Sequence, residues 1–78
     1  SGASVSIKVL GMFADEAIDS VDKFISDALV NGIDEIQIIH GTGSGILAKL
    51  IGEYLSTHPK IQRYYRQKGN LGITIVEL

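Results

Sequence analysis

Alternating apolar and polar residues near the start of the chain predict a first β-strand. Val5, Ile7 and Val9 alternate with Ser6 and Lys8, and a period of two is that of a strand buried on one face. Residues 15–31 change to spacings of three and four, which predict an amphipathic helix. The apolar stripe of this helix is Ala17, Ile18, Val21, Phe24, Ile25, Ala28 and Leu29. Acidic residues in the first turn complement the helix dipole, and the Asn-Gly pair at 31–32 predicts the end of the helix.

The rest of the chain predicts a second strand and helix, followed by two closing strands. Residues 36–39 are almost wholly apolar, which is typical of a central strand, and they lead directly into His40. Ser44 is the expected N-cap of a second helix, which ends before Pro59. Its apolar stripe is Leu47, Leu50, Ile51, Tyr54 and Leu55. Residues 61–66 and 73–78 predict two antiparallel strands joined by a turn at 68–70.

The element order is therefore βαβαββ, and residues 5–78 are expected to form one domain. Right-handed crossovers place both helices on one face of a four-stranded mixed sheet, which makes the fold class α/β, with the architecture of an α+β two-layer sandwich. Residues 1–4 are small and polar and are expected to be a linker or a cloning remnant. The other face of the sheet suits contact with a neighbouring domain or a second copy, so self-association is left open. Its residues are Ser6, Lys8, Leu10, Gln37 and Ile39.

The length and composition of the chain exclude several classes of protein. A chain of 78 residues makes one domain, which excludes a two-domain enzyme. The absence of cysteine excludes a disulfide scaffold, a thiolate zinc site and a cysteine nucleophile. Apolar runs of three or four residues are far shorter than a membrane span, so no membrane partner is expected and the predicted location is the cytoplasm.

The charge of the chain is unevenly distributed. A net charge of −2, taken as an average, argues against nucleic acid as a partner. Residues 1–39, however, contain two bases and seven acids and sum to −5, whereas residues 40–78 contain five bases and two acids and sum to +3. Four of those five bases lie between Lys60 and Lys68, with Tyr64 and Tyr65 among them. This basic run is either an ordinary solvated segment or part of a small anion-binding face.

The most informative motif lies between the second strand and the second helix, where residues 40–45 read HGTGSG. Glycines let the backbone turn sharply and let a ligand approach the amides of Gly41, Thr42, Gly43, Ser44 and Gly45. The helix N-terminus adds unpaired N–H groups, and the combination suits a phosphate. The motif lacks the lysine of a P-loop and the third glycine of a dinucleotide fingerprint. A glycine-rich turn without a ligand is the alternative.

His40 ends a strand at the edge where open α/β sheets bind ligands, and it can act there as a general acid or base. The alternative is a histidine that caps the strand or bonds the next turn. The loop after the first strand and residues 66–70, if the third strand is parallel to the first two, would reach the same edge. Their expected contributors are Gly11, Arg66, Lys68, Gly69 and Asn70. This convergence of cations, unpaired backbone amides and a histidine at one edge predicts that the domain binds a polyanion.

The chain resembles the Smr domain, the small MutS-related module, over about residues 5–78. The resemblance rests on Gly11 with the Glu-Ala pair at 16–17, on residues 38–47, on the pairs Tyr-Leu at 54–55 and His-Pro at 58–59, and on the closing GITIVEL at 72–78. The ending is similar to that of the MutS-paralogue branch, in which the domain closes a long chain containing an ATPase. The resemblance implies that the remainder of such an ATPase chain is a partner of this domain.

The same resemblance implies a βαβαββ sandwich that acts on DNA or RNA. Smr domains are associated with nicking DNA and cleaving RNA and, in the MutS paralogue, with suppressing recombination and rescuing collided ribosomes. The family's histidine-glycine motif falls on His40, Gly41, Gly43 and Gly45, with Thr42 where a lysine is frequent. The resemblance therefore implies a bacterial cytoplasmic protein associated with the nucleoid or with ribosomes.

Two departures from the family's motifs bear on activity. Lys8 stands where the family's N-terminal motif has an acid, and Leu10 where it often has an arginine. If that acid is a base or a metal ligand, this domain should cut poorly, although Lys8 adds a phosphate contact. The late glycine motif falls on residues 69–72 and has lost one glycine. No cofactor is evident and no ligand set for a metal is visible, so a divalent metal ion is left open.

Three hypotheses follow. In the first, the domain is a nicking endonuclease whose loop amides, Arg66 and Lys68 hold phosphates while His40 transfers protons. In the second, it is a cleavage-deficient binding module that positions its parent protein on branched DNA or ribosomal RNA. In the third, it is a protein-docking domain that uses the open face of the sheet.

Overall fold

The computed structural model describes residues 4–78 and contains two helices and four strands in the predicted order. The strands are β1 (Ser4–Lys8), β2 (Glu35–Ile39), β3 (Arg63–Gln67) and β4 (Asn70–Glu77), and the helices are α1 (Ala14–Val30) and α2 (Ile46–Ser56). β1 begins one residue before its expected start, and residues 1–3 of the expected linker lie outside the described residues. Neither helix in this described part is long and apolar enough to cross a membrane.

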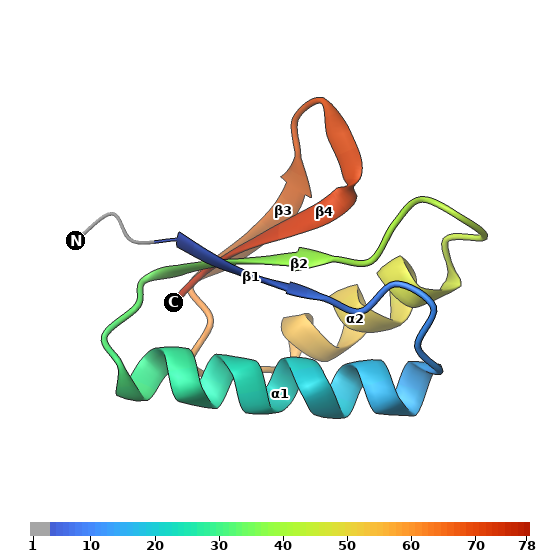
Figure 1. Ribbon diagram of the computed structural model, residues 1–78. Coiled ribbons are helices and arrows are strands. Elements are labelled where there is room, and N and C mark those ends of the chain that lie inside the picture. Colours follow the sequence, from blue (N-terminus) through green and yellow to red (C-terminus); the bar gives the residue numbers. More distant parts are fainter. Residues whose placement is uncertain (1–3) are drawn as a thin grey trace.

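The four strands form one mixed sheet in the order β1-β2-β4-β3. β1 and β2 are parallel, whereas β4 is antiparallel to both of its neighbours, β2 and β3. Consequently β3 runs in the same direction as β1 and β2, and the ends of these three strands lie at one edge of the sheet. Both helices lie on the same side of the sheet, as predicted (Figure 1).

The core lies between the sheet and the helices. α1 buries one stripe of small and branched residues against the sheet. α2 lies in the same layer and buries a second apolar stripe against the same sheet face. Full burial of an aliphatic side chain contributes about 1.5–3 kcal/mol, so this one layer supplies most of the stability of so short a chain. The largest fully buried side chains are Val9, Val21, Ile25, Ile36, Ile38, Ile51, Leu55 and Val76.

The opposite face of the sheet carries no helix in the described chain, as expected. Gln37 and Ile39 alternate with the buried residues of β2, and Ser6 and Lys8 pair with them in β1. Leu10, also expected on this face, lies in the loop beyond β1 and is exposed.

Three local expectations were wrong. Gly45, rather than Ser44, occupies the N-cap of α2, because its φ of +81° turns the chain into the helix by backbone conformation. The Ser44 hydroxyl lies 3.4 Å from the Ile46 amide, too far for a strong cap. The strands of the β3–β4 hairpin extend to a turn of only two residues, since Gly69 adopts a φ of +90°. β4 therefore begins at Asn70 rather than at residue 73, and β3 spans 63–67 rather than 61–66.

Candidate functional site

His40 leaves the end of β2 and turns inward, so that only 5% of its surface is exposed. Its Nε2 lies 2.7 Å from the Thr74 hydroxyl oxygen, and its Nδ1 lies 2.9 Å from the Gly41 carbonyl oxygen. A neutral ring satisfies both contacts, with Nδ1–H donating to the carbonyl and Nε2 accepting from the hydroxyl. The imidazole therefore links β2 to β4, which is the structural alternative considered from the sequence. To exchange a proton with a ligand, it must first release one of these partners.

The backbone beside His40 is also tied to β4. The amides of His40 and Gly41 both donate to the Gly72 carbonyl, at 3.0 and 2.9 Å. Gly41 has a φ of +79°, and a Cβ at that position would meet a methyl carbon of Leu10. The backbone conformation favours glycine, whereas the exposed Leu10 side chain is free to move aside. The loops after β1 and β2 are thus packed against each other and against the start of β4.

These loops enclose a small cleft at the predicted edge of the sheet, here called the His40 cleft. It has a volume of about 260 Å³ and is lined by Leu10, Gly11, Met12, His40, Gly41, Gly43, Ser44, Gly45, Leu47 and Ala48. The structure thus brings together six of the predicted site residues, namely Gly11, His40, Gly41, Gly43, Ser44 and Gly45. Thr42 is exposed in the same loop but does not line the cleft.

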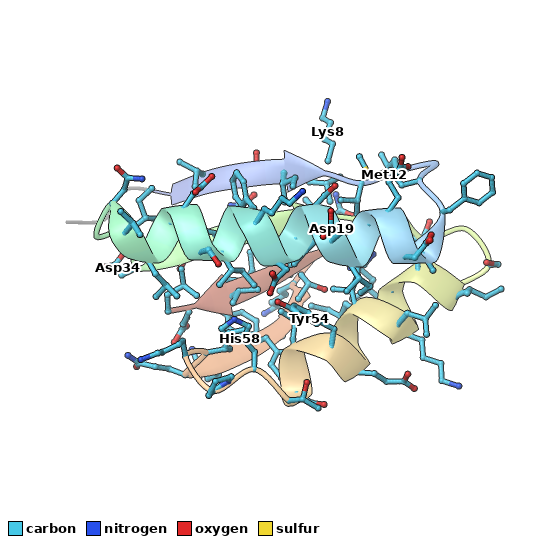
Figure 2. The ribbon with its side chains drawn as sticks, turned by 90° about the horizontal axis from the view of Figure 1, so that it is seen from below. Lys8, Met12, Asp19, Asp34, Tyr54 and His58 are labelled. Carbon is cyan, nitrogen blue, oxygen red and sulfur yellow. The ribbon has the colours of Figure 1, made fainter. Side chains whose placement is uncertain are left out.

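The remaining predicted site residues lie outside the cleft. Lys8 is exposed on β1, and its side chain extends away from the body of the domain (Figure 2). Lys68 and Gly69 form the hairpin turn, while the side-chain oxygen of Asn70 accepts a hydrogen bond from the Gly72 amide at 3.0 Å. Arg66 donates to the Leu71 carbonyl at 3.1 Å. The hairpin reaches the glycine loop through the backbone of Gly72, not through its cations.

Arg66 instead lines a second cavity, here called the hairpin pocket, between α2 and the β3–β4 hairpin. Its volume is about 240 Å³, and its lining residues are Ala48, Lys49, Gly52, Tyr64, Tyr65, Arg66 and Thr74. The pocket adjoins the His40 cleft, because Ala48 lines both and Thr74 is bonded to His40. Sequence reasoning missed Lys49 and Thr74, although a threonine in phase with the buried Val76 was a detectable signal.

The basic residues of the hairpin and of the adjoining helix α2 differ in whether an acidic side chain pairs with them. Arg63 forms an ion pair with Glu77 at 2.7 Å, and its guanidinium lies 4.8 Å from the centre of the Tyr65 ring. The hydrogen bond from Arg63 lowers the pKa of Glu77, and the same bond raises the pKa of Arg63. Within residues 4–78, Lys49, Arg66 and Lys68 have no acidic partner at ion-pair distance. These three cations are available to an external anion.

A third cavity, larger than the His40 cleft and the hairpin pocket, is bordered by acidic residues. It lies between α1 and α2, has a volume of about 680 Å³ and is bordered by Asp15, Asp19, Asp22 and Glu53. Asp19 and Tyr54 come from the two helices and lie on either side of it (Figure 2). The Tyr54 hydroxyl donates to Asp22, and burial together with this carboxylate raises the pKa of Tyr54. Carboxylates repel phosphates, so this helical surface is unsuited to nucleic acid.

No cluster of three or more histidine, cysteine or acidic side chains that could hold a metal ion occurs within residues 4–78.

Sequence similarity to known proteins extends over almost the whole chain. The family model described as the Smr domain matches residues 7–78. Among curated proteins, Endonuclease MutS2 of Clostridium botulinum strain 657 is 41% identical over 76 residues, which cover 94% of this chain and 10% of that protein. Endonuclease MutS2 of Helicobacter pylori strain 26695 is 42% identical over 79 residues, which cover 97% of this chain and 10% of that protein. The chain thus spans about a tenth of the length of these relatives.

Two solved structures share the fold. The Smr domain of Thermus thermophilus MutS2 superposes with a TM-score of 0.91 at 26% identity, covering 94% of this chain and 95% of that one. YdaL, a stand-alone small MutS-related protein from Escherichia coli, gives a TM-score of 0.90 at 26% identity, covering 99% of this chain and 68% of that one.

Proposed function

The chain belongs to the Smr domain family, and from this premise we propose that it acts on nucleic acid as a nicking endonuclease. The observation that carries the proposal is the His40 cleft, in which a histidine and the glycine loop before α2 line one small cavity. Backbone amides at a helix N-terminus suit the phosphate of a nucleic-acid backbone. The names of the curated relatives, both Endonuclease MutS2, support the same reaction class.

In this proposal the amides of residues 41–45 hold one phosphate, and cations outside the cleft hold the neighbouring phosphates of the strand. Arg66 and Lys68 lie on the hairpin, and Lys8, Gly69 and Asn70 lie at the same edge of the sheet as Gly11, which lines the cleft. His40 transfers a proton after its Nδ1 or Nε2 leaves its protein partner.

A second candidate function is a binding module that has lost cleavage. Two observations favour it. Both ring nitrogens of His40 are already bonded within the protein. In addition, Lys8 occupies the position where the family's motif has an acid, and it is exposed outside the cleft. Such a module would position its parent protein on branched DNA or ribosomal RNA.

The proposed biological setting is that of a MutS-type parent chain. The curated relatives are about ten times longer than the matched segment, so the remainder of such an ATPase is the proposed covalent partner. Suppression of homologous recombination and rescue of collided ribosomes are the proposed processes, in the cytoplasm at the nucleoid or at ribosomes.

Nicking of supercoiled plasmid by the purified chain, with and without chelator, tests the proposal. We expect His40→Ala and His40→Gln to reduce nicking at least about tenfold, while binding to the same plasmid changes little. The glutamine variant can keep one of the two hydrogen bonds of the imidazole, so it separates lost chemistry from lost folding. Equal nicking by wild type and both variants would reject His40 as the catalytic residue. Binding without nicking in the wild type would establish the second candidate.

A further inference from the structure

We propose that the hairpin pocket holds one unpaired base of the nucleic-acid strand whose neighbouring phosphate lies in the His40 cleft. This inference rests on the proposed function and adds a substrate class to it, a strand with at least one unpaired nucleotide in DNA or RNA. The pocket and the cleft are adjacent, since Ala48 lines both and the His40–Thr74 hydrogen bond lies between them. In this proposal the strand passes over this buried partition, with its phosphate in the cleft and its base in the pocket.

Tyr64 is placed to stack on such a base. It pairs with Val76 in β4, and Arg66 pairs with Thr74, whereas Ile36 and Ile38 in β2 pair with the same two β4 residues. Because paired residues face the same side of a sheet, Tyr64 and Arg66 lie on the helix-covered face. Tyr64 nevertheless keeps 38% of its surface exposed, and it borders the pocket. An exposed aromatic ring at a basic groove is the usual platform for unpaired bases.

Charge around the pocket suits the phosphates on either side of that base. Lys49 enters from α2 and Arg66 from β3, and none of the lining residues is acidic. Neither cation has an acidic partner within the described chain. The cavity between α1 and α2 is bordered by carboxylates instead, although residues of α2 line both cavities.

Gly52 lines the hairpin pocket without a side chain. It lies in the interior of α2, where glycine destabilises a helix relative to alanine. A Cβ at this position would meet no heavy atom within 4 Å, so packing does not require glycine there. Its φ also lies outside the left-handed region. The remaining consequence of glycine is space, because Gly52 lines the hairpin pocket.

The size of the pocket limits the occupant to a single base. At about 240 Å³ it is smaller than pockets for drug-sized ligands, which begin near 300 Å³. A stacked base pair cannot enter it, so the nucleotide must be unpaired or extruded from the duplex.

The test compares two oligonucleotides of equal length and charge by fluorescence anisotropy, one of thymidines and one abasic throughout. We expect wild type to bind the thymidine strand about tenfold more tightly than the abasic strand, since only the former can stack. A uridine strand included beside them distinguishes RNA from DNA as the source of the base. Equal affinity for the base-containing and abasic strands would overturn this inference and leave the proposed function standing. Failure to bind any of these strands would also overturn this inference, whereas the proposed function would then fall only if the chain neither binds nor nicks the supercoiled plasmid.

Substitutions of residues that line the hairpin pocket test whether the base binds there. Tyr64→Ala and Gly52→Leu should abolish the tenfold preference while leaving the affinity for the abasic strand nearly unchanged, the second by filling the pocket. Tyr64→Phe should retain the preference, because its ring still stacks. Ser56→Leu is the matched control for Gly52→Leu, one turn further along α2 and outside the pocket. Thermal melts verify that each variant is folded. If folded Tyr64→Ala and Gly52→Leu keep the preference, the hairpin pocket is not the base site.

Discussion

The contact between His40 and Thr74 gives the proposed catalytic residue a structural role. The two side chains are buried, at 5% and 4% exposure, and each completes the hydrogen bonding of the other. A buried nitrogen without its partner would carry a full desolvation penalty. The same bond fixes the ring plane beside the cleft. Histidine at this position is therefore explained by structure before catalysis is considered, and a catalytic role requires the bond to Thr74 or to Gly41 to open.

The cost of removing this bond is measurable. Thr74→Val keeps the shape of the side chain but removes the hydroxyl, which leaves His40 Nε2 buried and unpaired. We expect the free energy of unfolding, measured by urea denaturation, to fall by about 1–3 kcal/mol. Thr57→Val is the control, because the Thr57 hydroxyl bonds the Tyr54 carbonyl at an exposed site. An equal loss in both variants would show that the His40–Thr74 bond is not specifically stabilising.

At the scale of elements, the helices were predictable and the hairpin was only partly so. α1 and α2 follow from apolar residues spaced at three and four, a local signal. The place of β4 between β2 and β3 depends on pairing between distant residues, which no local pattern encodes. The buried run from Thr74 to Val76 marks a central strand, whereas β3 is mostly exposed, as an edge strand should be. The glycine loop predicted the His40 cleft, but the hairpin pocket required β4 to bring Thr74 beside α2.

The ion pair between Arg63 and Glu77 on the β3–β4 hairpin makes the stability of the domain depend on pH. The hydrogen bond from Arg63 lowers the pKa of Glu77 from its ordinary value of 4.5. A lowered folded-state pKa gives stability that is present above the unfolded value and is lost as pH falls through the folded value. Glu77→Gln should therefore be less stable than wild type at about pH 7, and the difference should shrink as the pH falls below 4.5. Urea denaturation across this range measures it. The effect should be small because the pair is solvent-exposed, and a difference independent of pH would contradict the assignment.

For the whole molecule, the arrangement of charge matters more than its sum. The helix layer borders its cavity with four carboxylates, whereas free cations lie on the hairpin and on the adjoining face of α2. A chain with a net charge of −2 thus separates a basic pocket beside the hairpin from an acidic groove between the helices. If the chain binds nucleic acid as proposed, phosphates should be attracted to the first and repelled by the second.

Salt dependence tests whether the hairpin cations belong to the interface. Each phosphate contact removed should reduce the slope of log Kobs against log salt by about 0.7 on a single strand. Arg66→Ala combined with Lys68→Ala should therefore weaken binding across sequences and reduce that slope by about 1.4. Lys23→Ala is the matched control, since Lys23 lies on α1 and pairs with Asp19 at 3.1 Å. The control should leave the slope unchanged, because its charge is already partnered and lies outside the hairpin. An unchanged slope in the double variant would remove the hairpin turn from the interface, even if the His40 cleft still binds a phosphate.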